Sequence, residues 1–291
     1  MKVMKLSKMI EGKQILNDVH FELKANEIVG LIGRNGSGKT TLFRTLTGQY
    51  LPDKGEIELD GILLLTATQS KSELFYIDEA ENFLAPYTLK MINQFYRTAY
   101  PNFNQDLFLT LTGSHQLPLH VNYHGLSKGM QGLFNMILAI SSNARFLLLD
   151  EPFDGLDVIV RKDVIGLLLE HISDNQRTAL IASHNLNELE NLADRVLLLK
   201  NQTIIKDYRL EEMRESAKKI QMVFKTKKIP SLVKEHSRLL TIQGRVITAI
   251  FEDFNQDLAN KIQTLQPVLF EELPLSLEDL FEANLKEKMP R

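Results

Sequence analysis

Three glycines, a lysine and two threonines stand close together near the start of the chain, in an order suited to phosphate binding. The segment Gly33-Arg34-Asn35-Gly36-Ser37-Gly38-Lys39-Thr40-Thr41 contains the pattern G-x-x-x-x-G-K-[ST]. Glycines let backbone N–H groups curl around a β-phosphate, the lysine bridges the β- and γ-phosphates, and the threonine hydroxyl ligates Mg²⁺. We therefore interpret residues 33–41 as a nucleotide-binding loop, with Lys39 as a catalytic cation and Thr40 as a metal ligand. The alternative is a glycine-rich turn with an incidental lysine.

Two acids follow a short apolar segment later in the chain. Residues 146–149 read Phe-Leu-Leu-Leu, which is typical of a buried strand, and Asp150, Glu151 and Pro152 come directly after them. A carboxylate at the carboxyl end of a buried parallel strand lies beside the phosphate loop in such folds. We predict that Asp150 holds Mg²⁺ through water and that Glu151 is the general base that polarises the attacking water. The alternative is a surface turn with two acids and a helix-stopping proline.

A histidine occupies the corresponding place after the next apolar segment. His184 follows the predicted strand 178–182, so it lies at the same edge of the sheet as the two acids. A γ-phosphate needs a donor on its far side, and we assign that role to His184. A lone histidine in this place is otherwise a helix cap or a packing residue.

These residues require a set of alternating elements to position them. The loop stands between a predicted strand (28–32) and a predicted helix (42–46), and a turn at 52–55 leads to an alternating strand at 56–60. After residue 127 the predicted elements are a helix through 140, strand 146–149, helix 158–171, strand 178–182, helix 186–193 and strand 195–200. Apolar strands separated by helices predict a parallel sheet covered on both faces.

The predicted fold class is α/β. It comprises a P-loop NTPase core with a parallel sheet, an antiparallel β subdomain and a helical insertion at about 80–140, plus a small C-terminal α+β domain. Residues 1–206 form the predicted nucleotide-binding domain, and residues 207–291 form the predicted accessory domain.

Composition removes several classes of protein. The 291 residues include no cysteine, which excludes disulfide frameworks, thiolate metal sites and cysteine nucleophiles. The formal net charge is −3, so no bulk positive field attracts nucleic acid, and we expect no nucleic acid partner. The stretch 107–127 lacks Asp, Glu, Lys and Arg, but it contains too many polar residues to span a bilayer. No secretory signal follows the first residues, so we expect the chain to stay in the cytosol.

Five ordered elements give the chain a resemblance to the ATP-binding subunit of an ABC transporter, over about residues 1–210. The phosphate loop resembles the family's Walker A loop, and the strand ending at Asp150 resembles its Walker B strand. Leu126-Ser127-Lys128-Gly129-Met130 is similar to the signature LSGGQ, Gly155-Leu156-Asp157 to the D-loop, and Ser183-His184 to the H-loop.

The resemblance implies an ATPase that uses ATP and Mg²⁺ and works as a head-to-tail dimer. Each ATP would be held by residues 33–41 of one subunit and by Ser127 and Gly129 of a second ATP-binding subunit, identical or paralogous. It also implies a separate permease as partner, which would place the chain at the cytoplasmic face of the membrane. We expect the permease near Phe83, Pro86 and Tyr87.

Several residues depart from the family's pattern. Glu79 stands where the Q-loop glutamine is usual. We expect Glu79 to ligate Mg²⁺; the alternative is a solvated helix-cap acid. Lys128 and Met130 replace Gly and Gln in the signature. Ile10 stands where an aromatic residue usually stacks on adenine, and Val158 where proline is common.

The direction of transport is indicated by the C-terminal segment. Residues 275–281, Leu-Ser-Leu-Glu-Asp-Leu-Phe, are similar to the tail of ATPase subunits from bacterial exporters of antibiotics, peptides or lipids, which favours export over import. Two other functions remain as alternatives. One is a soluble ABC ATPase acting on ribosomes or DNA, and the other is a regulatory protein that binds ATP with little turnover.

Overall fold

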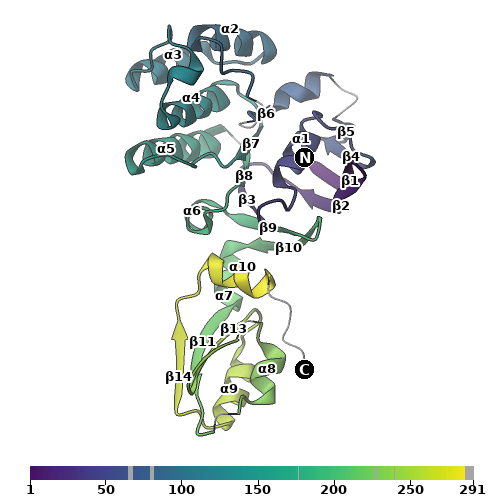
Figure 1. Ribbon diagram of the computed structural model, residues 1–291, viewed down its shortest axis with the longest axis vertical. Coiled ribbons are helices and arrows are strands. Elements are labelled where there is room, and N and C mark those ends of the chain that lie inside the picture. Colours follow the sequence, from purple (N-terminus) through teal and green to yellow (C-terminus); the bar gives the residue numbers. More distant parts are fainter. Residues whose placement is uncertain (65–67, 79–81, 176, 227, 239, 286–291) are drawn as a thin grey trace. The chain divides into compact units, whose positions relative to one another are not determined.

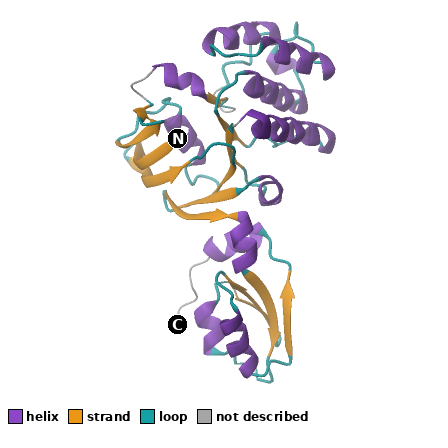
Figure 2. Ribbon diagram, turned by 180° about the vertical axis from the view of Figure 1, so that it is seen from behind, coloured by secondary structure: helices purple, strands orange, loops and turns teal. Residues whose placement is uncertain are grey.

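The computed structural model describes residues 1–64, 68–78, 82–175, 177–226, 228–238 and 240–285. Contacts within the chain divide it into two compact units, drawn in Figures 1 and 2. The first unit comprises Met1–His184 and Leu197–Lys206, and the second comprises Asn185–Val196 and Asp207–Arg291. Each unit is described separately below.

The first unit contains a small sheet, most of a six-stranded sheet and the long helices. The small antiparallel sheet has the strand order β2-β1-β4-β5 and is built from β1 (Lys2–Ile10), β2 (Lys13–Glu22), β4 (Lys54–Leu59) and β5 (Ile62–Leu63). The six-stranded sheet has the order β10-β9-β3-β8-β7-β6; its strands are β3 (Ile28–Ile32), β6 (Leu74–Tyr76), β7 (Phe146–Asp150), β8 (Thr178–Ala182), β9 (Arg195–Lys200) and β10 (Thr203–Arg209). The helices are α1 (Lys39–Leu46), α2 (Leu89–Ala99), α3 (Gln105–Ser114), α4 (Lys128–Ser141) and α5 (Val158–Asn175), with short 3₁₀ turns η1 (Thr68–Glu73) and η2 (Tyr123–Gly125).

The predicted parallel sheet is confirmed in the pairs that surround the phosphate loop. β3 pairs with β8, β8 with β7, and β7 with β6, all in parallel. Every residue of β3 and β8 is buried, as expected for strands covered on both faces. The carboxyl ends of these strands therefore share one edge of the sheet. Figure 1 shows α2 to α5 on one side of this sheet and α1 with the small antiparallel sheet on the other.

Helix α1 is fixed by the core between the two sheets. Leu42 and Phe43 of α1 belong to one buried cluster with Leu16 of β2, Leu31 of β3 and Ile57 of β4. The helix begins at Lys39, three residues before the predicted start, because Gly38 adopts a φ of +107° at its N-cap and ends the loop there. The core thus holds the lysine and threonine of the loop on the first turn of a buried helix.

The predicted helical insertion consists of three capped helices. Thr88, Asn104 and Ser127 are the N-caps of α2, α3 and α4, and each side chain accepts a hydrogen bond from the backbone of the first turn. Leu89, Ile92 and Tyr96 of α2 are buried. Phe95 of the same helix is 52% exposed.

The second unit is a small α+β fold. Its elements are α6 (Leu186–Leu192), α7 (Leu210–Ser216), β11 (Lys218–Val223), α8 (Ser231–His236), β12 (Leu240–Gln243), β13 (Val246–Phe251), α9 (Gln256–Thr264), β14 (Leu269–Leu273) and α10 (Leu277–Leu285). The strands form an antiparallel sheet of order β12-β13-β11-β14. One face of this sheet packs on α8 and α9 through a cluster that includes Met222, Phe251 and Ile262. In the described part of the chain, no helix combines the length and the apolarity that crossing a bilayer requires.

Candidate functional site

A pocket of about 430 Å³ opens where the phosphate loop meets the carboxyl edge of the parallel strands. It is lined by Ile15, Asn35, Gly36, Ser37, Gly38, Lys39, Thr40, Thr41, Asp78, Asp150 and Glu151. Seven consecutive residues of the predicted loop and both predicted acids are therefore brought together, although more than a hundred residues separate them in the sequence.

The loop is shaped by its glycines. Gly36 and Gly38 have φ values of +76° and +107°, which side chains rarely permit. At Gly33 an added Cβ would lie 2.9 Å from the carbonyl oxygen of Leu199, so no larger residue fits. Ser37 Oγ is buried and finds no hydrogen-bond acceptor or donor among the described residues. A buried polar atom without a partner at this point fits a loop whose ligand supplies the missing contact.

The side chain of Lys39 is buried and hydrogen-bonded to the start of the loop. Lys39 is 8% exposed, and its Nζ donates a hydrogen bond to the carbonyl oxygen of Gly33 at 2.9 Å. A phosphate group in the pocket would offer this ammonium group a charged acceptor in place of a neutral one.

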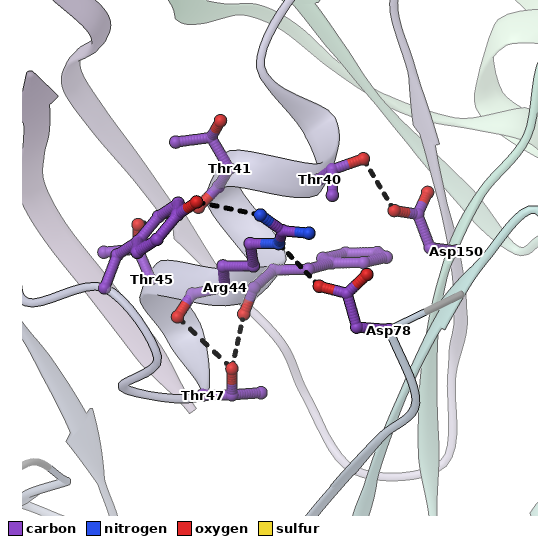
Figure 3. A network of polar contacts seen from close by, with 9 residues as sticks. Thr40, Thr41, Arg44, Thr45, Thr47, Asp78 and Asp150 are labelled. Carbon is purple, nitrogen blue, oxygen red and sulfur yellow. Dashed lines mark hydrogen bonds and ion pairs between the residues drawn. The ribbon is translucent and has the colours of Figure 1, made fainter. Parts of the chain in front are cut away.

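A short hydrogen bond joins the loop to the end of β7. Thr40 Oγ1 donates to Asp150 Oδ2 at 2.7 Å (Figure 3). Burial raises the pKa of Asp150, and the charges of Glu151 and Asp78 raise it further, against the Thr40 hydrogen bond and the Lys39 charge. The carboxylate therefore lies where an added cation would stabilise its charged form.

Glu151 and His184 form a pair at the ends of β7 and β8. Glu151 has a φ of +48°, and its backbone N–H donates to the carbonyl oxygen of Ala182 at 2.8 Å. Its Oε2 accepts hydrogen bonds from His184 Nδ1 at 2.8 Å and from the His184 backbone N–H at 3.1 Å. The carboxylate thus orients the imidazole and leaves its other nitrogen available for a ligand.

Asp78 and Ile15 line the pocket, and the sequence analysis missed both. Tyr76 of β6 pairs with Leu148 of β7, so Asp78 leaves its strand at the same level as Asp150. A signal was present, because residues 74–77 read Leu-Phe-Tyr-Ile before Asp78, just as an apolar run precedes Asp150. Ile15 belongs to an ordinary alternating strand, and nothing in its sequence context distinguishes it.

Other predicted site residues do not line this pocket in the described part of the chain. Gly33 is linked to the pocket by its hydrogen bond with Lys39, and His184 by its hydrogen bond with Glu151. Arg34 is exposed, and its carbonyl oxygen accepts a hydrogen bond from the Ser37 N–H at 3.0 Å. Glu79 lies outside the described residues.

The two predicted signature residues lie at the start of α4. Ser127 Oγ accepts a hydrogen bond from the Met130 N–H at 3.3 Å, and Ser127 itself is exposed. Gly129 lies beside Val160 of α5, since an added Cβ would stand 3.5 Å from that side chain. Neither residue is among those that line the pocket. Ser127 is thus exposed and Gly129 half-buried at a helix N-terminus, which attracts anions.

The oxygen atoms of the pocket suit a hard divalent cation. The Thr40 hydroxyl and the Asp150 and Glu151 carboxylates are the kind of donor that Mg²⁺ takes, usually together with phosphate oxygens. Within the described residues, no group of three or more His, Cys, Asp or Glu side chains is arranged to hold a metal ion by itself. A Mg²⁺ ion here would therefore depend on the phosphates for part of its coordination.

Comparisons with known proteins agree with this geometry. Residues 16–154 match the family model described as "ABC transporter". The chain is 31% identical over 278 residues to ABC transporter ATP-binding protein YtrB of Bacillus subtilis, covering 96% of this chain and 95% of that protein. It is 30% identical over 208 residues to the nickel import system ATP-binding protein NikE of Staphylococcus aureus, covering 69% and 86%.

Solved structures show the same fold. An ATP-binding subunit of an ABC transporter superposes with a TM-score of 0.65 and 24% identity, covering 74% of this chain and 91% of that one. A dimeric ATP-binding cassette in a post-hydrolysis state, bound to ADP and Pi, superposes with a TM-score of 0.63 and 20% identity, covering 72% and 98%.

Proposed function

The chain belongs to the ABC transporter ATP-binding family, and from this premise we propose that it is one of two ATP-binding subunits that energise a separate membrane permease. The single observation that carries the proposal is the Glu151–His184 pair at 2.8 Å, one residue beyond the carboxylate that is bonded to the phosphate loop. This arrangement brings a general base and an oriented imidazole to the phosphate end of the pocket.

The residues of this chain divide the work of hydrolysis. Lys39 and the N–H groups of residues 35–40 bind the β- and γ-phosphates, and Thr40 and Asp150, with Glu79 as a further candidate, would hold Mg²⁺. The ion would neutralise charge on the phosphates. Glu151 accepts a proton from the attacking water, and His184, whose Nδ1 is bonded to Glu151, stabilises the γ-phosphate through Nε2.

A second ATP-binding subunit is proposed to complete each site. Ser127 and Gly129 offer an anion-binding helix N-terminus that faces no phosphate of its own chain, and Val158 and Ile159 next to them are 67% and 74% exposed. Exposed apolar residues beside an anion site suit contact with another protein surface. The dimeric cassette among the structural neighbours supports this arrangement through its fold.

The permease is proposed to bind an aromatic strip at the start of the helical insertion. We define the aromatic strip as Phe83, Pro86, Tyr87, Met91 and Phe95, all exposed on or before α2. The rings of Phe83 and Phe95 contact each other with centroids 5.4 Å apart. Binding a permease through this strip would keep the chain at the cytoplasmic face of the membrane.

Two observations bear on the direction of transport. We keep export as the proposal because residues 275–281 resemble the tails of exporter ATPases. Import is a second candidate, because NikE is named for nickel import and matches over 208 residues. In proteoliposomes with the ATP-binding subunits outside, turnover stimulated by Ni²⁺ enclosed in the lumen would favour import.

Replacement of the general base tests the function. Glu151→Gln is expected to lower kcat for ATP about 10²–10⁴-fold, because the amide cannot accept the proton, while ATP binding is retained. Turnover is measured by phosphate release, and binding by calorimetry with Mg²⁺ and ATP. Glu56→Gln, an exposed change on β4, is the matched control and should leave kcat unchanged. A Glu151→Gln variant with ordinary turnover would refute the assigned role.

A further inference from the structure

A buried ion pair lies next to the nucleotide pocket, between helix α1 and the end of strand β6. Arg44 Nε donates to Asp78 Oδ2 at 2.5 Å, and the two side chains are 12% and 6% exposed. On its other side, Arg44 Nη1 donates to Tyr50 Oη at 2.8 Å, and the guanidinium group lies over the Tyr50 ring. Figure 3 shows Arg44 pointing from α1 toward Asp78. The guanidinium group is thus fixed at both ends.

The pair joins the two segments that carry the reactive end of the site. Arg44 lies four residues after Thr40, so the two side chains project from similar sides of α1. Asp78 lines the pocket and leaves β6 at the level at which Asp150 leaves β7. Beside the ion pair, the Phe43 and Tyr76 rings pack edge to face with centroids 5.8 Å apart. A change in the ion pair would therefore shift the end of β6 relative to the helix that carries Lys39 and Thr40.

The pair also sets the charge balance of the pocket. Three carboxylates, Asp78, Asp150 and Glu151, line it. The hydrogen bond that Arg44 donates to Asp78 raises the pKa of Arg44, against the opposing effect of burial, so the guanidinium stays charged. Removing one partner of a buried pair leaves the other charge without compensation, which favours rearrangement of the segment.

We propose that Arg44 and Asp78 are positioning residues for ATP hydrolysis, which hold the end of β6 against α1 so that the phosphates and Mg²⁺ meet a fixed arrangement of oxygen donors. This proposal rests on the proposed function, ATP hydrolysis at the pocket beside the phosphate loop. Both residues act through Thr40 and Asp150 rather than on the reacting atoms. The pair contributes to the step that needs the metal more than to binding of the nucleotide alone.

The experiment is a double-mutant cycle with Arg44→Gln, Asp78→Asn and the double variant, all in the full chain. Three quantities are measured: kcat and KM for ATP with Mg²⁺, the Kd of ATP with and without Mg²⁺ by calorimetry, and the thermal midpoint by circular dichroism. Each single change is expected to lower kcat about tenfold or more and to weaken the gain in ATP affinity that Mg²⁺ provides. The Kd of metal-free ATP should change less than about threefold, and the double variant should be no worse than the worse single one.

Controls separate positioning from a loss of folding. Arg44→Lys keeps the buried positive charge but loses the rigid, planar set of guanidinium donors. It is expected to lower kcat about threefold or more. This variant tests the proposal even if the neutral variants do not fold. Asp60→Asn removes a partner of Arg145 in an exposed pair at 2.6 Å and should leave kcat within about twofold.

Two results would overturn the proposal. One is a folded single variant whose kcat and Mg²⁺ effect both stay within about twofold of the wild type; the other is a double variant whose loss equals the product of the single losses. Failure of the proposed function would look different, because the unchanged wild-type chain would then lack turnover that depends on Glu151.

Discussion

Individual side chains in the pocket are held in place by hydrogen-bond partners, from the loop itself or from the ends of β7 and β8. Thr40 is bonded to Asp150, Glu151 to His184, and Lys39 to the carbonyl oxygen of Gly33. In each case the group that would contact phosphate, water or metal already has a fixed direction. Such preorganisation lowers the cost of binding a transition state, since little has to move when charge develops.

A prediction at this scale concerns the Thr40 hydroxyl. Thr40→Val keeps the shape but removes the proposed metal ligand and the bond to Asp150, so the kcat measured with Mg²⁺ should fall about 10–100-fold. Metal-free ATP should bind with nearly unchanged affinity, as measured by calorimetry in the presence of a chelator. Thr47→Val is the matched control on the same segment, because the Thr47 hydroxyl bonds only to backbone carbonyls of α1 among its described contacts. Equal Mg²⁺ dependence in Thr40→Val and wild type would contradict the assignment.

At the scale of elements, helix α10 is tied to strand β11 through one aspartate. Asp279 accepts hydrogen bonds from Lys219 Nζ at 2.8 and 2.9 Å and from the N–H and hydroxyl of Ser276, both at 3.0 Å. Burial alone would raise the pKa of Asp279, but these donors together lower it. The ionised carboxylate therefore stabilises the second unit.

The lowered pKa of Asp279 determines how the free energy of unfolding changes with pH. Because the folded pKa is lowered, the stabilisation is complete above the unfolded value of about 3.9 and is lost as the pH falls through the folded value below it. Asp279→Asn should lower the free energy of unfolding by about 1 kcal/mol at pH 7, and this difference should be smaller at pH 3, below the unfolded pKa.

The measurement is urea unfolding followed by circular dichroism, since the chain has no tryptophan. Asp257→Asn, which breaks an exposed pair with Lys261 on α9, serves as control and should change stability by less than about 0.5 kcal/mol. If Asp279→Asn lowered the free energy of unfolding equally at pH 7 and at pH 3, the ionised carboxylate would not be the source of the stabilisation.

The aromatic strip gives a second prediction for an element. The paired change Phe83→Ser and Met91→Ser should abolish complex formation with the permease, because the contact loses its apolar surface, while ATPase activity of the isolated chain stays within about twofold. The chain is co-expressed with a candidate multi-span permease, and the complex is assayed by co-purification in detergent. Leu109→Ser on α3, where the residue is 48% exposed, is the control. Complex formation that survives the paired change would place the permease elsewhere.

For the whole molecule, local patterns in the sequence predicted the parallel sheet and most of the pocket. They did not predict which strands lie next to each other in the sheet. The glycine spacing and the apolar run before Asp150 are local signals, and the fold confirms both elements. Asp78 enters the pocket only because β6 lies beside β7, and a single sequence does not reveal that pairing. Residues 185–196 were expected with the first domain, whereas contacts group them with the second unit, since Glu190 of α6 accepts a hydrogen bond from the Leu277 N–H of α10.

The central proposal is that two ATP-binding subunits complete each other's sites, and for a dimer of identical chains the most direct test is to mix two inactive variants. Lys39→Ala removes the phosphate lysine, and Ser127→Arg blocks the exposed start of α4, so each variant alone should lack turnover. In an equal mixture, half of the dimers carry both changes on opposite subunits and keep one intact site of two, which restores about a quarter of wild-type activity. The matched control mixes each single variant with a chain that carries both changes, because no dimer in those mixtures holds an intact site. If the first mixture stays inactive although both variants bind each other, the claim of a shared site is wrong.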